Sequence, residues 1–445
     1  MLDQTGDDER LEQGDGAWLV PPDRYLDQNP PRFDGWQRSS CYVTVRDGTR
    51  VAVDVHLPAA REEGLRFPAI VLFTPYYRRF ALKEGYNLEV EPSPNAAQFR
   101  EAFVPYGYAV VVVDVRGTGA SFGWRDGFRS PKERGDYYDV VDWIVAQPWS
   151  DGAVGATGIS YVGAAADFLA STGHKAVKAI VPTFSVWDTW SNHLWPGGVL
   201  LTVVPTLYGK LCRAMDLDDR EHVLKYAYFA DPDFAGPAPV DDDEDGSLLA
   251  AAIAEHGHNV DMVGFADALE YRDSALAYDP DYTSASISPY HYAERANDMG
   301  TACLGVTGWM DGGGYSTGAI QRYTWQRNPA RRLLIGPWDH GARAHVSPWR
   351  RAEALRFALL GEYLRFFDTH LKGLDSGLPE EKPIHYYTMG AEAWQAAATW
   401  PPGATSTMEL FFDEAAKLNS ERPRHGDGVD HYLADFASGS GRQTR

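Results

Sequence analysis

The stretch Thr157–Gly163, with the sequence TGISYVG, lies where a short apolar run gives way to small, helix-forming residues. A serine between nearby glycines at such a strand-to-helix corner is typical of a nucleophile elbow, whose strained turn lifts the Oγ of Ser160 clear of the sheet. Glycines leave room there for the neighbouring strand and helix. The general pattern is G-x-S-x-G, whereas here the second glycine, Gly163, comes one position later. From this stretch alone, an ordinary tight turn stays open as the alternative.

Continuous apolar runs before and after this corner indicate strands covered on both faces, as in a mostly parallel sheet. These runs are Pro68–Phe73, Ala109–Val113, Ala179–Pro182, Ala302–Thr307 and Arg332–Ile335. Apolar residues at helical spacing predict a helix within Glu133–Gln147, ended by Pro148, and another between residues 355 and 371. Upstream, β-rich runs on either side of Asp47-Gly48 predict a hairpin. The sequence therefore predicts an α/β fold.

Composition excludes several classes of protein. The 445-residue chain has a net charge of -21 and a pI near 5.0, which argues against non-specific nucleic-acid binding. No apolar run approaches the roughly 20 residues of a membrane span. The acidic start, Met1–Arg10, lacks the features of a secretory signal, so a cytoplasmic location is expected. Cys41, Cys212 and Cys303 lie far apart, so neither a disulfide framework nor a zinc cluster is expected, and no cofactor or metal is predicted.

Three residues at the ends of predicted strands suit nucleophilic catalysis. An activated serine needs a base that takes its proton and a carboxylate that orients the base, and in α/β-hydrolases the chain order is serine, acid, histidine. Ser160, Asp311 and His340 follow that order. Asp311 as a turn former and His340 as an ordinary loop residue are the structural alternatives. Asp339 competes for the acid role, but beside His340 it would point the wrong way from a strand end.

An oxyanion hole needs two hydrogen-bond donors. The backbone N–H of Tyr161 supplies one, at the start of the expected helix. The second should come from the loop after Pro68–Phe73, where no HGGG-type stretch occurs. The hydroxyl of Tyr76 is the candidate there, and a merely packed aromatic ring is its alternative.

Six motifs, in this order, resemble the cocaine esterase / X-Pro dipeptidyl-peptidase family of serine hydrolases, the CocE/NonD type or peptidase family S15. They are Thr74-Pro75-Tyr76, Asp114-Val115-Arg116-Gly117-x-Gly119-x-Ser121, Gln147-Pro148-Trp149-Ser150-Asp151-Gly152, Gly158-x-Ser160-Tyr161-x-Gly163, Gly308-Trp309-x-Asp311 and Gly336-Pro337-Trp338-x-His340. The resemblance implies Ser160 as nucleophile, His340 as base and Asp311 as acid, with Tyr76 and Tyr161 as oxyanion donors. It also implies that a second glycine one position later than in the general pattern, here Gly163, is the spacing usual in this family.

The resemblance further implies an α/β-hydrolase core with an inserted helical cap and a C-terminal β jelly roll. On this sequence the expected division is an N-terminal arm over 1–38, a core over 39–185 and 289–376, a cap over 186–288, and a jelly-roll module over 377–445. The arm should be irregular and lie on the surface. The last module is too short for about eight strands, so we expect it to be incomplete and to contain no closed two-sheet sandwich.

We therefore expect a serine hydrolase that cleaves acyl esters through an acyl-enzyme. The alternatives are an X-Pro dipeptidyl-peptidase with the same triad, or an inactive fragment or scaffold. Family members that act on α-amino acid esters carry carboxylates just after the acid, where this chain has Gly312–Gly314. Trp195 either lines the acyl pocket or packs the cap. The expected partner is a small acyl ester or short peptide, with no nucleic acid or membrane; oligomeric state and acyl specificity stay open.

Overall fold

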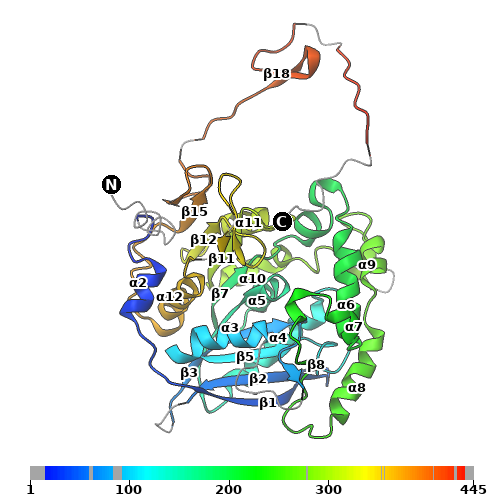
Figure 1. The fold of residues 1–445 in the computed structure, drawn as a ribbon, viewed down its shortest axis with the longest axis vertical. Helices are drawn as coiled ribbons and strands as arrows, with labels where there is room; N and C mark the ends of the chain where they lie inside the picture. The colour runs from blue at the N-terminus through cyan, green and yellow to red at the C-terminus, as the bar shows by residue number, and fades with distance from the viewer. Residues whose placement is uncertain are drawn as a thin grey trace.

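The computed structural model describes residues 16–59, 64–83, 93–276, 279–351, 353–354, 356–403, 405–424 and 428–435. Its centre is a ten-stranded sheet in the order β1-β2-β5-β3-β6-β7-β11-β12-β15-β16 (Figure 1). Neighbouring strands are parallel from β5 through to β15, and antiparallel at both edges of the sheet. The mixed α/β fold with a mostly parallel sheet is thus confirmed.

The strands of this sheet include the apolar runs of the sequence. Their bounds are β1 Trp36–Thr44, β2 Arg50–Pro58, β3 Phe67–Thr74, β5 Ala109–Asp114, β6 Ser150–Ile159, β7 Val177–Thr183, β11 Ala302–Gly308, β12 Arg331–Gly336, β15 Ile384–Thr388 and β16 Ala393–Ala397. The hairpin at Asp47-Gly48 is confirmed, because β1 and β2 pair antiparallel with Thr44 opposite Arg50.

Both faces of the central strands are buried, which explains why their sequences lack polar alternation. In β5, Val111 and Val113 point into one apolar cluster, and Val110 and Val112 into the other. Successive side chains of a strand point to opposite faces, so each face needs its own helices. Helices α4 (Pro131–Val145) and α5 (Tyr161–Ser171) cover the first, and α3 (Pro94–Phe103) and α12 (Leu359–Lys372) the second.

The N-terminal segment departs from the expected irregular surface arm. Pro22–Gln28 forms helix α2, which begins with a proline at its first position, where the missing N–H costs nothing. Trp18 and Tyr25 are buried, and the Tyr25 hydroxyl donates to Asp368 of α12 at 2.8 Å. Burial of these aromatic rings against α12 and the sheet is more favourable in free energy than their exposure to solvent. The acidic start at Met1–Arg10 lies outside the described residues.

The segment between β7 and β11 carries short helices rather than strands of the central sheet (Figure 1). They are α6 Gly209–Asp216, α7 Arg220–Val223, α8 Ser247–Glu255 and α9 Met262–Ala268. A short strand, β8 (Phe234–Pro237), pairs with β4 (Phe80–Leu82) from the loop after β3. The segment is therefore joined to the loop that carries Tyr76. A further pair, β9 (Ala275–Leu276) and β10 (Asp279–Thr283), precedes helix α10 (Ala293–Met299).

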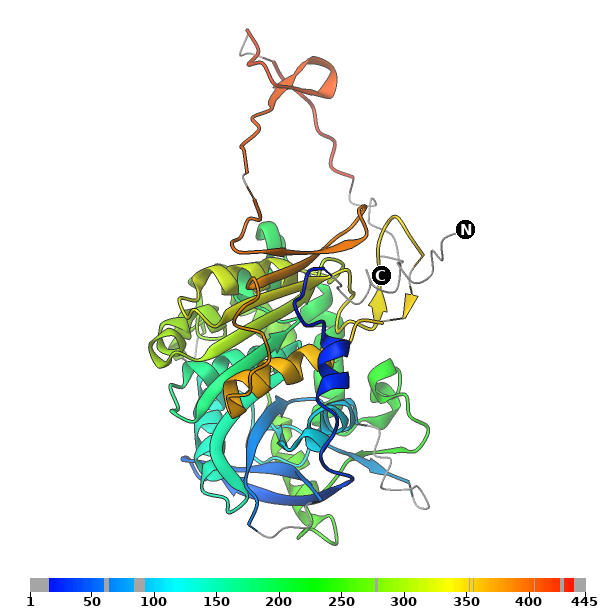
Figure 2. The same ribbon diagram turned by 90° about the vertical axis from the view of Figure 1, so that its left-hand side faces the viewer.

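The C-terminal region also differs from expectation. Strands β15 and β16, assigned above to a separate module from residue 377, lie in the central sheet, since β15 pairs parallel with β12. Buried Ile384 and Tyr387 explain this, because their side chains fill the apolar clusters on the two faces of the sheet. Beyond Ala397, the described residues form the small hairpin of β17 (Phe411–Asp413) and β18 (Lys417–Asn419), which extends away from the sheet in both views (Figures 1 and 2).

Candidate active site

Ser160 stands at the corner between β6 and α5, which end and begin on either side of it. Its backbone has φ 64° and ψ -117°, a conformation that costs a non-glycine residue about 1–3 kcal/mol. The Ser160 N–H donates to the carbonyl of Thr183 on β7 at 3.0 Å, which helps to hold this strained turn. The side chain is half-buried and lines a cavity at the carboxyl edge of the sheet.

The spacing of the two glycines around Ser160 follows from this packing. A Cβ on Gly163 would lie 2.6 Å from the carbonyl oxygens of both Gly158 and Thr183. A Cβ on Gly158 would lie 2.2 Å from the Cγ1 of Val162, and its φ of +149° also favours glycine. The second glycine therefore occupies the place where α5 presses on β6 and β7, one position later than in the general pattern.

Asp311 and His340 are brought together by neighbouring parallel strands. Gly308 at the end of β11 is in register with Gly336 at the end of β12, so the loops that follow leave the same edge of the sheet. The Nδ1 of His340 lies 2.9 Å from Oδ1 of Asp311. The Asp311 side chain is fully buried, whereas that of His340 keeps 20% of its surface exposed. This arrangement leaves the Nε2 edge of the imidazole available to another group.

Asp339 makes different contacts. Its Oδ1 accepts a hydrogen bond from the backbone N–H of Ala344 at 2.9 Å, and its Oδ2 lies 3.6 Å from Arg343. These contacts close the loop after β12. Asp339 thus shapes the loop that carries His340, and the contact between imidazole and carboxylate belongs to Asp311.

The hydroxyl of Tyr76 lies 2.8 Å from that of Tyr208, in the segment between β7 and β11. Burial raises the pKa of Tyr76, and hydrogen bonds with Tyr208 and Ser160 only partly oppose this rise. The hydroxyl is therefore neutral at neutral pH and able to donate. The Tyr161 side chain points elsewhere, since its hydroxyl donates to Glu133 on α4 at 2.5 Å. That bond fixes the first residue of α5, whose N–H follows Ser160.

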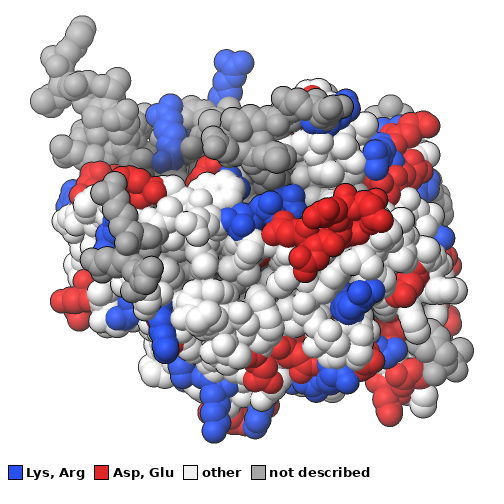
Figure 3. Space-filling view, turned by 90° about the horizontal axis from the view of Figure 1, so that it is seen from below, with Lys and Arg blue, Asp and Glu red and all other residues white. Residues whose placement is uncertain are grey.

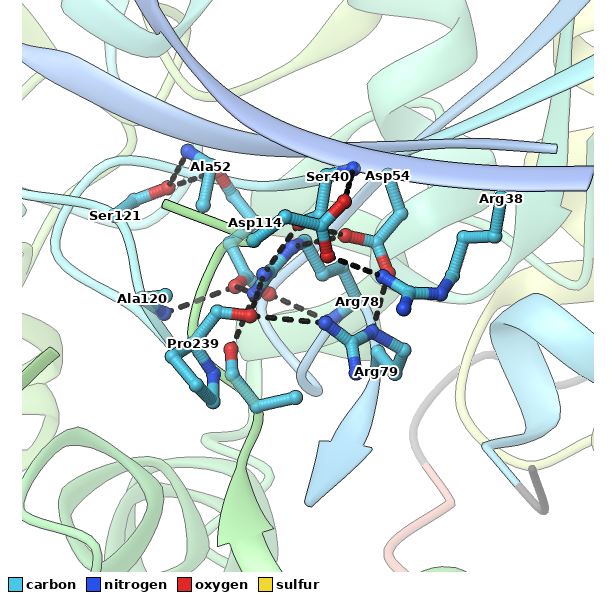
Figure 4. A network of polar contacts seen from close by, with 12 residues as sticks. Arg38, Ser40, Ala52, Asp54, Arg78, Arg79, Asp114, Ala120, Ser121 and Pro239 are labelled. Carbon is cyan, nitrogen blue, oxygen red and sulfur yellow. Dashed lines mark hydrogen bonds and ion pairs between the residues drawn. The ribbon is translucent and has the colours of Figure 1, made fainter. Parts of the chain in front are cut away.

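A buried polar network holds the loop that carries Tyr76 (Figure 4). Arg78 is completely buried and lies between Asp54 on β2, at 2.7 Å, and Asp114 at the end of β5, at 2.9 Å. The backbone N–H of Arg78 also donates to Asp114. A second carboxylate oxygen of Asp54 pairs with Arg79 at 2.8 Å. The loop is thus fixed to two strands of the sheet only two residues from Tyr76.

The side chains of Ser160, His340 and Tyr76 face one cavity of about 640 Å³. The lining includes Tyr76, Ser160, Tyr161 and His340 from the core, together with Arg129 and His193 and a set of aromatic and aliphatic side chains: Phe128, Val186, Val203, Val204, Leu207, Tyr208, Leu211, Tyr226, Tyr228, Phe229 and Tyr315. Such a size and composition suit a small organic molecule.

Trp195 is not among the described residues that line this cavity. Its ring stacks on that of Trp190, with centroids 5.2 Å apart. Gly313 and Gly314, in the run after Asp311, pack on Asn192, and a Cβ on Gly314 would lie 2.6 Å from the Cα of that residue. The glycines thus allow the loop after β11 to approach the segment after β7.

Several residues of the site carry no recognisable sequence signal. Tyr208, Arg129 and His193 lie outside regular strands and belong to no motif, so only the three-dimensional arrangement brings them to Ser160. Glu133, which supports Tyr161, lies in the predicted helix, but its role depends on the crossing of α4 and α5. Within the described ranges, no group of three or more His, Cys, Asp or Glu side chains could hold a metal ion, and no helix is long and apolar enough to cross a membrane.

A strained serine at a strand-to-helix corner, with an Asp-paired histidine three strand ends away in a mostly parallel sheet, is the arrangement of the serine hydrolases of the α/β class. Comparison with known proteins agrees with that class. The family model described as X-Pro dipeptidyl-peptidase (S15 family) matches residues 47–342. The chain therefore belongs to this family, the CocE/NonD group of serine hydrolases.

Individual relatives agree with this family assignment. A Mycobacterium bovis protein named "Putative serine esterase Mb1866c" is 38% identical over 97% of this chain and 71% of its own length. The cocaine esterase of Rhodococcus sp. is 27% identical over 86% of this chain and 63% of its own. The crystal structure of a CocE/NonD family hydrolase from Staphylococcus aureus superposes with a TM-score of 0.62 at 18% identity, over 87% of this chain and 61% of that one. The chain thus spans less than two thirds of the length of the last two.

Proposed function

We propose that the protein is a serine esterase that cleaves carboxylic esters through an acyl-enzyme, with Ser160 as nucleophile, His340 as base and Asp311 as the orienting acid. The observation that carries this proposal is the 2.9 Å contact between His340 and Asp311 on the cavity that Ser160 lines. The esterase names of relatives at 38% and 27% identity support it.

In the acylation step the Ser160 Oγ attacks the ester carbonyl carbon while Nε2 of His340 takes the hydroxyl proton. Asp311 accepts from Nδ1 and stabilises the imidazolium that forms. The carbonyl oxygen becomes an oxyanion, which the Tyr76 hydroxyl and the Tyr161 N–H stabilise by donating hydrogen bonds. When the bond to the alcohol oxygen breaks, His340 gives its proton to the leaving alkoxide and the acyl group stays on Ser160.

Deacylation repeats these steps with water. His340 removes a proton from a water molecule, which attacks the acyl carbon, and the oxyanion hole again holds the negative charge. Collapse of the second intermediate returns the proton to Ser160 and releases the carboxylic acid. Tyr208 supports this step when its hydroxyl is the donor in the contact with Tyr76, because the Tyr76 proton is then free for the oxyanion.

We propose a cap over 186–288 and a core that includes β15 and β16, with a β module beginning after Ala397. The cavity lining supports this division, since it combines core residues with residues 203–211 and 226–229 of the proposed cap. Trp195 would stabilise the cap through Trp190 rather than contact the acyl group.

Replacement of Ser160 by alanine tests the esterase proposal. We expect kcat for 4-nitrophenyl butyrate to fall by about 10⁴-fold or more, because the nucleophile is lost. A fluorophosphonate probe should label Ser160 in the wild type, and peptide mapping should find the label there. Full activity in the Ser160→Ala variant would refute the proposal, and absence of labelling in folded wild-type protein would favour an inactive scaffold.

A matched pair of substitutions tests the acid. Asp311→Asn should lower kcat by about 10³–10⁴-fold, because the imidazole loses its orienting carboxylate. Asp339→Asn, which makes the same chemical change beside His340 in the sequence, should cost about tenfold or less, since Asp339 contacts the loop backbone. The reverse order of losses would transfer the acid role to Asp339.

A further inference from the structure

Arg129 is a cationic residue that lines the cavity of Ser160 while remaining only 2% exposed. Its backbone has φ 59°, a strained value for a non-glycine residue. The guanidinium lies over the ring of Phe128, 4.4 Å from its centroid, and over the ring of Tyr161, at 5.5 Å. Phe128, Arg129 and Tyr161 all line the cavity that Ser160 lines, so the positive charge lies on the wall of that cavity.

Arg129 forms no ion pair with any described carboxylate. With the described residues its side chain makes one hydrogen bond, from Nη2 to the Thr189 hydroxyl at a long 3.3 Å, and its buried Nε has no partner among them. Arginine presents five donors, and a buried charge normally needs a counter-charge. Two other buried arginines show the usual arrangement: Arg125 is paired with Asp216 at 2.5 Å and Arg322 with Asp167 at 2.7 Å.

His193 adds a second unsatisfied nitrogen on the same wall. It lines the cavity, and its buried Nδ1 has no hydrogen-bond partner in the part of the chain that the structure describes. Its ring stacks on Phe128, the residue before Arg129, with centroids 6.1 Å apart, and lies 5.9 Å from Tyr315, which in turn lies 5.0 Å from His340. Burial and the nearby Arg129 lower the pKa of His193 to about 3, so the imidazole is neutral and keeps one N–H to donate.

The charge of the cavity is opposite to that of the chain. The described lining residues include two arginines, Arg129 and Arg343, and neither an aspartate nor a glutamate. The chain as a whole has a net charge of -21, and acidic side chains gather on the face shown in Figure 3. A cleft lined by one sign of charge attracts ligands of the other.

We propose that Arg129 and His193 form a carboxylate-binding subsite in this cavity, and that the preferred substrates are esters that carry a free carboxylate. The planar guanidinium donates to the carboxylate oxygens and the His193 N–H donates a further hydrogen bond. The same wall disfavours a substrate with a free N-terminal ammonium, which a dipeptidyl-peptidase has to bind. This inference rests on the proposed esterase activity and specifies its substrates.

The test compares two chromogenic esters with equal numbers of acyl carbon atoms, the anionic 4-nitrophenyl hydrogen adipate and the neutral 4-nitrophenyl hexanoate. The measured quantity is the ratio of kcat/KM for the anionic ester to that for the neutral one, in which any general loss of activity cancels. We expect the wild-type ratio to exceed 1, and Arg129→Met to lower it by about 10- to 100-fold, the range of a charge-assisted hydrogen bond. His193→Phe, which keeps a ring beside Phe128, should lower it by a smaller factor.

Arg343→Met is the matched control. Arg343 also lines the cavity, but its side chain is 64% exposed and lies 3.6 Å from Asp339. This variant should change the ratio by about threefold or less, because solvent screens an exposed charge. A wild-type ratio at or below 1, or an equal effect of Arg343→Met and Arg129→Met, would overturn the subsite.

Binding without turnover separates this inference from the esterase proposal. In the Ser160→Ala background, calorimetric titration with monoethyl adipate should give a Kd that Arg129→Met raises by about 10-fold or more. Failure of both chromogenic esters with a retained Arg129-dependent Kd would refute the esterase alone, and an Arg129-independent Kd would refute the subsite.

The carboxylate could belong to the acyl or to the alcohol part of the ester. Faster turnover of 4-nitrophenyl hydrogen adipate than of 4-butyryloxybenzoate, each relative to its uncharged analogue, assigns it to the acyl part, and the reverse assigns it to the alcohol. Either result supports the subsite as long as the wild-type ratio of the anionic adipate to the neutral hexanoate exceeds 1.

Discussion

Arg78 and Arg129 are both almost completely buried, yet they lie in opposite electrostatic environments. Arg78 is enclosed by Asp54 and Asp114, which supply its counter-charge (Figure 4). Its remaining side-chain donors bond to the Ser40 hydroxyl and to the carbonyls of Ala238 and Pro239. Arg129 has aromatic rings on its faces and one long hydrogen bond. Cation–π contacts contribute about 0.5–2 kcal/mol, less than the several kcal/mol that burial of a charge costs. The difference indicates that Arg78 maintains the fold, whereas Arg129 keeps donors free for a ligand.

The largest expected effect concerns Arg78. Arg78→Met would leave Asp54 and Asp114 buried without their shared counter-charge, so we expect the free energy of unfolding to fall by about 3–5 kcal/mol. Urea denaturation followed by tryptophan fluorescence measures this loss. Arg38→Met is the control, because Arg38 pairs with Asp241 at the surface and should cost about 1 kcal/mol or less. Equal losses would contradict the structural role of Arg78.

A second prediction applies the comparison to two buried histidines. Burial, with Arg332 nearby, lowers the pKa of His385 to about 3, although its Nε2 lies 3.1 Å from the Ala17 carbonyl. In the unfolded chain this histidine has the ordinary pKa of about 6.5, so it takes up a proton there first as the pH falls. The free energy of unfolding therefore has its full value above pH 6.5 and decreases as the pH falls from 6.5 to about 3. Between pH 7 and pH 5 the wild type should lose about 2 kcal/mol more than His385→Phe, which cannot titrate.

The same measurement on His193→Phe sharpens the contrast. His193 has a similarly lowered pKa but an unpartnered Nδ1, and titration depends on burial in both cases. We expect a comparable pH-dependent difference for His193→Phe, whereas only this variant should alter the preference for anionic esters. A pH-independent stability difference for both variants would show that neither histidine is held neutral in the folded protein.

The smallest expected effect concerns Arg129. Because Arg129 has no carboxylate partner among the described residues, Arg129→Met should leave no buried carboxylate uncompensated and should remove a buried charge. We therefore expect the free energy of unfolding to fall by no more than about 1 kcal/mol, or to rise. Urea denaturation beside Arg78→Met gives the direct comparison. A loss as large as that of Arg78→Met would show that Arg129 has a structural role equal to that of Arg78.

Much of the fold follows from local sequence, because strands buried on both faces must be apolar throughout. Runs such as Ala109–Val113 therefore predict strands, and the motifs place Ser160, Asp311 and His340 at strand ends. Burial of the N-terminal segment and the pairing of β15 with β12 were missed. Both depend on contacts between residues far apart in the chain, such as Tyr25 with Asp368 and Leu333 with Ile384. The spacing of residues along the chain does not predict such contacts.

The cavity wall was beyond prediction for a related reason. Arg129, His193 and Tyr208 come from three separate irregular or short segments, and each residue alone has several ordinary structural explanations. What distinguishes Arg129 is a counter-charge that is missing among the described residues, and that can be recognised only when all neighbours are in place.

The hydrogen bond between Tyr76 and Tyr208 has a consequence for how such enzymes diversify. It joins a loop of the sheet to the segment after β7, so the proposed oxyanion donor is oriented by a residue outside the core. Exchange of that segment for another would change substrate preference and the reaction rate together, unless the replacement supplied a hydroxyl at the same place. A segment recombined into this fold would therefore have to preserve this one partner.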